Sequence, residues 1–146
     1  MQQATYNATT NEMQRGEGDV AALQQTRVRF TAAQINAGAT LLPAVPGRAY
    51  RYIDAQMISV GGAAAGATDV RILGTRAAGS VALLVVAIAA LTQSAVVRSG
   101  AANATVLADG ASHTPLDVNT PVTVGKTGAS LTGSTNIDVM ITYALE

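Results

Sequence analysis

Three side chains with the chemistry of a hydrolase lie close together in the sequence: Ser112, His113 and Asp117. A Ser/His/Asp triad needs a nucleophile, a base and an orienting acid at a fixed geometry, which separate elements of a fold normally supply. Three near neighbours in one turn, next to Asp109-Gly110, rarely provide it. We therefore interpret His113 as a loop histidine and predict no catalytic residues.

Metal and cofactor sites are not indicated either. The chain has no cysteine and one histidine, which argues against thiolate sites and Cys/His clusters. Its aspartates lack the 1-3-5 spacing of a calcium loop. Gly125-Lys126-Thr127 resembles the end of a phosphate-binding loop, but the first glycine of that motif would fall at Thr120, and no amphipathic helix follows. We expect no metal and no cofactor.

Charge limits the classes of partner. Only 12% of residues are charged and the formal net charge is zero, which argues against direct nucleic-acid binding. The charge is nevertheless uneven, because residues 1–26 carry −2, residues 27–98 carry +5 and residues 99–146 carry −3. A basic middle between acidic ends suits pairing between segments or subunits. The alternative is a scatter of solvated charges that contribute little.

The longest apolar run without charge, proline or glycine is Val81 to Leu91. It is too short for a transmembrane helix, which needs about 20 apolar residues. We predict a buried strand over residues 81–86 and a short turn or helical corner over residues 87–91. We expect Asp at Val85 to prevent folding, since a charge in this run has no evident partner.

No secretion signal is visible after Met1, where polar residues replace the basic and apolar regions of a signal peptide. With the shortness of the central run, this predicts no export by that route and no membrane partner.

Most of the remaining chain has the pattern of short strands. Residues 27–35 and 137–145 alternate apolar and polar side chains, most clearly in the second. Residues 48–60 carry apolar side chains on both faces, with Tyr50, Tyr52, Ile58 and Val60 on one face and Ile53, Ala55 and Met57 on the other. This pattern indicates that both faces are covered or that a β-bulge shifts the register. Two prolines predict that residues 41–47 form an extended edge segment. We predict a turn at residues 125–128, which begin and end with glycine. About eight strands at roughly 8–12-residue spacing predict an all-β fold over residues 27–146, an antiparallel sandwich or jelly roll.

Residues 1–26 form a different segment, polar and without strand alternation. A segment of this kind cannot bury enough of itself to offset its ordering entropy. We predict an extended N-terminal arm that is either disordered or ordered along another subunit. Its partner-binding residues would be widely spaced apolar anchors, namely Tyr6, Met13, Val20 and Leu23.

Three stretches carry a family resemblance: Ala33-Gln34-Ile35-Asn36-Ala37-Gly38-Ala39-Thr40-Leu41-Leu42-Pro43, then Tyr50 to Met57, and Ile137 to Tyr143. In residue composition and in short sequence runs they resemble the capsid decoration, or cement, proteins of tailed bacteriophages, which have a jelly-roll fold. The resemblance implies a homotrimer on the outer capsid surface, between capsomers of the major capsid protein, with a terminal arm that reaches a neighbour. It implies a virion protein assembled in the bacterial cytoplasm, and no catalysis.

Two functions remain open at this point. The first is a non-enzymatic virion protein that binds the assembled shell as a trimer and stiffens it against internal DNA pressure. A trimer is expected because strands with two partly apolar faces leave surface that one thin sandwich cannot bury. The second is a receptor- or glycan-binding domain of a phage fibre or spike. Such a site presents aromatic and polar side chains in exposed loops, whereas these tyrosines lie in predicted strands or in the arm.

Overall fold

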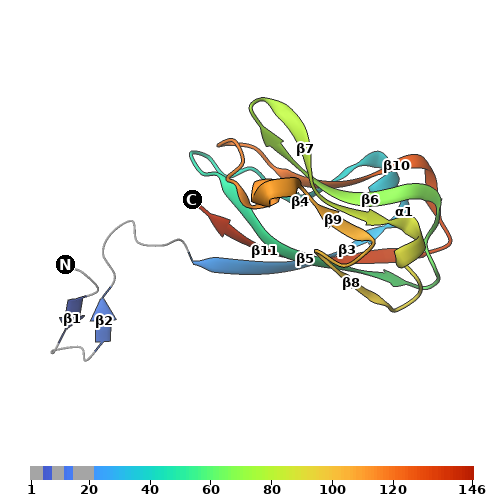
Figure 1. Cartoon of the computed structure of the whole chain (residues 1–146), viewed down its shortest axis with the longest axis horizontal. Coiled ribbons are helices and arrows are strands. Elements are labelled where there is room, and N and C mark those ends of the chain that lie inside the picture. The colour runs from blue at the N-terminus through green and yellow to red at the C-terminus, as the bar shows by residue number, and fades with distance from the viewer. Residues whose placement is uncertain (1–4, 8–11, 15–21) are drawn as a thin grey trace.

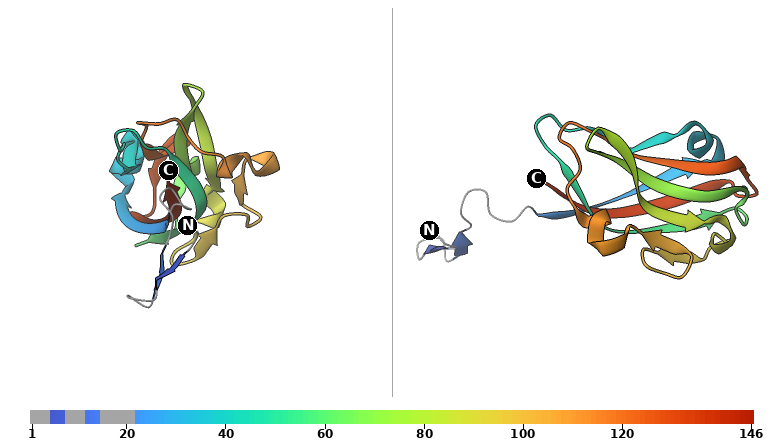
Figure 2. Two further views of the ribbon diagram at one scale, coloured as in Figure 1. Left: turned by 90° about the vertical axis from the view of Figure 1, so that its left-hand side faces the viewer. Right: turned by 45° about the horizontal axis from the view of Figure 1, so that its top comes forward.

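Two antiparallel β-sheets lie face to face in the computed structural model, which describes residues 5–7, 12–14 and 22–146 (Figures 1 and 2). The first sheet has the spatial order β4 (Ala39–Leu42), β10 (Val122–Thr132), β6 (Ala65–Arg76), β7 (Gly79–Ala87) and β9 (Ala104–Val106). The second has the order β3 (Leu23–Thr31), β11 (Asn136–Leu145), β5 (Tyr50–Val60) and β8 (Val96–Arg98). The predicted all-β sandwich is confirmed.

The order of pairing is that of a jelly roll. Four antiparallel pairs are nested along the chain: β3 with β11, β4 with β10, β5 with β8, and β6 with β7. Successive pairs belong alternately to the two sheets, so the chain winds around the core as a folded double strand. Strand β9 is added at the edge beside β7. This winding places β3, the first strand of the sandwich, at one edge of its sheet.

The core lies between the sheets and includes the central apolar run. Strand β7 is followed by the short 3₁₀ helix η1 (Ile88–Ala90), as the sequence predicts. Leu84, Val86 and Leu91 are fully buried. Val85, by contrast, is only partly buried and lies beside a shallow hollow on the outer side of the sheet. The expectation that Val85 is a core position is therefore wrong, because strand alternation turns it away from its buried neighbours.

Strand β5 changes its buried face through a bulge. Tyr50 and Tyr52 are buried in its first half, and Ala55 and Met57 in its second. The register between β5 and β11 shifts between Thr142 and Tyr143 of β11, which pair with Asp54 and Tyr52 of β5. The bulge is therefore the correct explanation of the two apolar faces, since one extra residue reverses the alternation.

The strand predicted for residues 27–35 ends earlier than expected. Helix α1 (Ala32–Ala37) begins directly after β3, and Thr31 caps it. The Thr31 hydroxyl accepts a hydrogen bond from the Gln34 backbone N–H, while the Gln34 side chain accepts one from the Thr31 N–H. This reciprocal capping box stabilises a helical turn in a sequence that alternates like a strand.

The turn predicted at residues 125–128 is also wrong. These residues lie inside β10, which pairs with β6 along this stretch. Gly128 has a φ of 78°, and the register shifts between Thr127 and Gly128, so the glycine forms a bulge instead of a turn. A phosphate-binding loop curves around its ligand, whereas Gly125-Lys126-Thr127 is part of an extended, paired strand. The segment therefore does not have the conformation of a phosphate-binding loop.

The N-terminal part of the described chain contains strands as well. Strands β1 (Thr5–Asn7) and β2 (Glu12–Gln14) form a two-stranded antiparallel pair, which Figure 1 shows apart from the sandwich. Strand β3 begins at Leu23, and residues 23–26 pair with β11. The predicted N-terminal arm therefore includes a short strand pair, and its last four residues, 23–26, belong to β3 of the sandwich. No helix in the described ranges is long and apolar enough to cross a membrane.

Candidate interaction surface

The side chains that suggested a hydrolase have separate structural partners. The Ser112 hydroxyl donates to the Leu83 carbonyl (2.6 Å) and accepts from the Leu107 N–H (2.8 Å). The Asp117 carboxylate accepts from the backbone N–H groups of Ala77 and Ala78 (3.0 and 2.9 Å). These two alanines have positive φ angles in the β6–β7 turn, so Asp117 secures a strained turn. The structure does not bring Ser112 and Asp117 together as parts of a triad.

His113 is packed against a tyrosine. It ends the short 3₁₀ segment η2 (Ala108–His113), and its ring stacks on that of Tyr52 with centroids 5.6 Å apart. Its Nδ1 atom lies 3.1 Å from the Tyr52 carbonyl oxygen. Burial raises the pKa of Tyr52 to about 12, so its phenol remains neutral and hydrogen-bonds with the Ser99 hydroxyl. The pair joins η2 to β5.

The outer face of the sheet β4-β10-β6-β7-β9 carries one closed ion pair. Asp69 accepts two hydrogen bonds from Arg71 (2.8 and 2.7 Å). Burial alone would raise the pKa of Asp69, but hydrogen bonds from Arg71 and Thr127 together hold it below its ordinary value. A shallow hollow beside Asp69 is lined by Val85, Ala87 and small polar side chains. The described residues contain no cluster of three or more histidine or acidic side chains suited to a metal.

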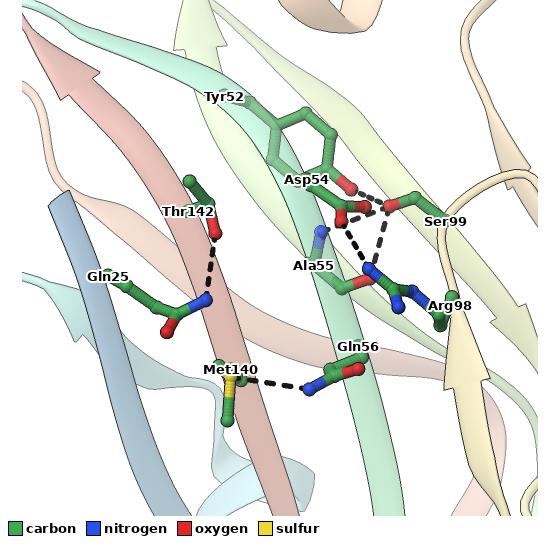
Figure 3. A network of polar contacts seen from close by, with 9 residues as sticks. All are labelled: Gln25, Tyr52, Asp54, Ala55, Gln56, Arg98, Ser99, Met140 and Thr142. Atoms are coloured by element: carbon green, nitrogen blue, oxygen red, sulfur yellow. Dashed lines mark hydrogen bonds and ion pairs between the residues drawn. The ribbon is translucent and has the colours of Figure 1, made fainter. Parts of the chain in front are cut away.

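The outer face of the other sheet, β3-β11-β5-β8, is richer in charge. We call it the arginine face and define it by four arginines and three acids: Arg27, Arg29, Arg51, Arg98, Asp54, Asp138 and Glu146. All four arginines bond to an acid on a neighbouring strand or at the C-terminus. Figure 3 shows part of this face, with Arg98 directed toward Asp54.

Asp138 lies at the centre of this charge pattern. Arg29 donates two hydrogen bonds to its carboxylate, from Nε (2.7 Å) and Nη2 (3.0 Å), and Arg27 donates a further one. The Arg29 hydrogen bond is the largest cause that lowers the pKa of Asp138 to about 2, and Arg27 adds to it against the opposing effect of burial. The carboxylate is therefore ionised at every physiological pH and fixes β3 against β11.

The arginine side chains of these pairs are more exposed to solvent than the acidic side chains that they bond. The Arg27 and Arg29 side chains are 58% and 53% exposed, whereas that of Asp138 is 4% exposed. The Arg98 side chain is 66% exposed and that of Asp54 40%. Because the acids lie deeper than their partners, the charged side chains that meet solvent on this face are mainly arginines.

Neutral and apolar side chains fill the space between these charges. Gln25 donates to the Thr142 hydroxyl (3.2 Å), and Gln56 to the Met140 sulfur (3.3 Å), both across neighbouring strands (Figure 3). Leu23 and Val96, on the two edge strands of the sheet, are 62% and 54% exposed. Arginine and methionine are enriched in protein interfaces, and such a mixture is typical of one.

The predicted partner-binding residues have different positions. Leu23 is exposed at the start of β3, and Tyr6 and Met13 lie opposite each other in the register of β1 and β2. Val20 lies outside the described residues. Sequence reasoning did not identify the arginine face as a site, although the uneven charge was its signal. Three pairs, Arg27–Asp138, Arg29–Asp138 and Arg51–Glu146, join the basic middle of the chain to its acidic end.

Comparison of the chain with protein-family models, with curated proteins and with solved structures gave no match.

Proposed function

We propose that this protein is a non-enzymatic structural protein of a tailed-phage virion. In this proposal it binds the outer surface of the head as a homotrimer, between capsomers of the major capsid protein, and stabilises the shell. A ligand that binds only the assembled shell stabilises it by mass action, without any chemical step.

The observation that carries the proposal is the arginine face, a sheet surface of salt-bridged arginines and scattered apolar side chains on a jelly roll. Jelly rolls occur in viral capsid domains and in lectins, so the fold alone does not choose between these functions. A sheet face suits contact with another protein surface, whereas small ligands are bound in concave pockets.

The receptor- or glycan-binding alternative is less well supported. Within residues 22–146, every aromatic side chain of Phe or Tyr type is buried, with exposed fractions of 4% for Phe30, 4% for Tyr50, 1% for Tyr52 and 8% for Tyr143. Sugar binding normally uses aromatic side chains that are accessible at the surface. In this part of the chain only the His113 ring remains near the surface, and it is stacked on Tyr52.

The experiment that tests the proposal mixes the purified protein with empty expanded capsids and, separately, with host cells. We expect the protein to pellet with the capsids and to remain in the supernatant of the cells. Adsorption to cells alone would support the fibre or spike alternative and contradict the proposed function.

A further inference from the structure

We infer that the arginine face is the surface that contacts the shell, and that it binds an acidic protein surface there. This inference rests on the proposed function and adds to it the face of the molecule and the chemistry of the partner.

The two outer faces of the sandwich differ in the exposure of their arginines. On the face of β4-β10-β6-β7-β9, Arg71 is 27% exposed and donates two hydrogen bonds to Asp69, from Nε and Nη2. On the arginine face, Arg27, Arg29 and Arg98 are all more than half exposed. A partner that approaches the first face meets a closed pair, and one that approaches the second meets accessible cations.

Two of these arginines keep unused hydrogen-bonding capacity. A guanidinium has five N–H donors, of which a bidentate carboxylate uses two. Arg98 bonds to Asp54 through Nη2 alone, at 3.2 Å, and Arg27 bonds to Asp138 through Nη2 alone. Each side chain is more than half exposed and has further N–H groups without a hydrogen-bond partner among the described residues. A carboxylate of a partner can use them without breaking the pairs inside the sheet.

The low net charge of the arginine face indicates the class of partner. Four arginines against three acids leave a net charge of +1 on this face. A nucleic-acid surface needs many cations that are free to neutralise phosphates. A protein surface with a few well-placed acids needs only complementary positions, and the paired acids keep the arginines oriented.

Exposed apolar residues lie on both edges of this sheet. Leu23 lies on β3 and Val96 on β8, the two edge strands. Because both edge strands carry an exposed apolar side chain and an exposed arginine, the whole width of the sheet is available to one partner. Arg27 on β3 and Arg98 on β8 report on these two sides separately.

The test compares capsid binding of the unaltered chain with that of Arg98→Glu and Arg27→Gln. The matched controls are Arg76→Glu and Arg76→Gln, which change the charge equally at the end of β6, where Arg76 bonds to the Thr114 carbonyl. All variants are first checked for an unchanged melting temperature. Arg27→Gln leaves Asp138 its two hydrogen bonds from Arg29, so the fold is expected to persist.

Arg98→Glu should weaken binding to empty expanded capsids by about tenfold or more, and Arg27→Gln by about threefold, while the controls bind like the unaltered chain. If either face variant binds like its control, the arginine face is not the contact surface. If the unaltered chain fails to bind capsids, the proposed function itself is wrong.

A titration with a short DNA duplex completes the test. Tight DNA binding that is lost in Arg98→Glu would identify a phosphate-binding face and overturn the assignment of an acidic protein partner.

Discussion

Arg29 and Asp138 are directly opposite each other on β3 and β11 and form a two-point ion pair, although 109 residues separate them in the sequence. The pair closes the outermost of the nested strand pairs of the jelly roll. A carboxylate that is buried while its cation remains exposed is sensitive to loss of either partner. This relationship gives the first prediction.

Asp138→Asn should lower the free energy of unfolding by about 2 kcal/mol, because Arg27 and Arg29 lose the charge that they share. Asp54→Asn is the matched control, since its exposed pair with Arg98 should contribute less than about 1 kcal/mol. Urea unfolding of both variants at pH 7 measures the difference. Equal stabilities of the two variants would contradict the central role of Asp138.

The Asp138 carboxylate should also make the stability of the fold depend on pH in acidic solution. The pKa of Asp138 is lowered from 3.8 to about 2 in the folded chain, so the folded state holds this proton less tightly than the unfolded state. Its contribution is complete above pH 3.8 and is lost as the pH falls toward 2. Melting curves across this range should show a steeper loss of stability for the unaltered chain than for Asp138→Asn. Parallel curves would show that Asp138 is not the responsible group.

Neighbouring positions in β7 should respond in opposite ways to the same substitution. Val86→Asp should prevent folding, because the side chain is fully buried and an unpaired charge there costs several kcal/mol or more. Val85→Asp should give a folded protein, because Val85 faces the hollow beside Asp69. Soluble yield and melting temperature measure both. Failure of Val85→Asp to fold while Val86→Asp folds would reverse the assigned faces of the strand.

Two N-terminal deletions should separate folding from attachment. Removing residues 1–22 leaves β3 complete, so the melting temperature should be unchanged while trimer formation or capsid attachment weakens. Removing residues 1–26 also removes four residues that pair with β11, and it should lower the melting temperature. Sedimentation and capsid pelleting give the two readouts. Unchanged assembly and capsid binding after removal of residues 1–22 would show that this segment has no role in attachment.

The unaltered protein should sediment as a trimer at micromolar concentration. The physical reason is the unpaired outer edge of β3 in the described sandwich, which is open to pairing with a second copy. A stable monomer at this concentration would contradict the trimer that we propose.

Local pattern was sufficient to predict the strands whose side chains alternate without interruption. Residues 137–145 correspond to β11, and a bulge explains why residues 48–60 carry apolar side chains on both faces. Local pattern failed where two signals compete. Thr31 and Gln34 form a capping box inside an alternating stretch, and Gly128 forms a bulge in a glycine-rich segment that looked like a turn.

The candidate site was less predictable than the fold. The pairing of Arg29 with Asp138 depends on which strands become neighbours, and no local periodicity encodes contacts over such a separation. Only the uneven charge along the chain indicated that the middle and the C-terminal end attract each other. The arginines of β3 and β8 are more exposed than the acids that they bond, and this difference depends on the pairing of the strands within the sheet.

Electron microscopy of the parent virion tests the proposed function most directly. The account predicts density for this jelly roll on the outer surface of the head, between capsomers, in groups of three, with the sheet β3-β11-β5-β8 toward the shell. Density for this protein at a fibre or spike tip, and none on the head, would contradict it.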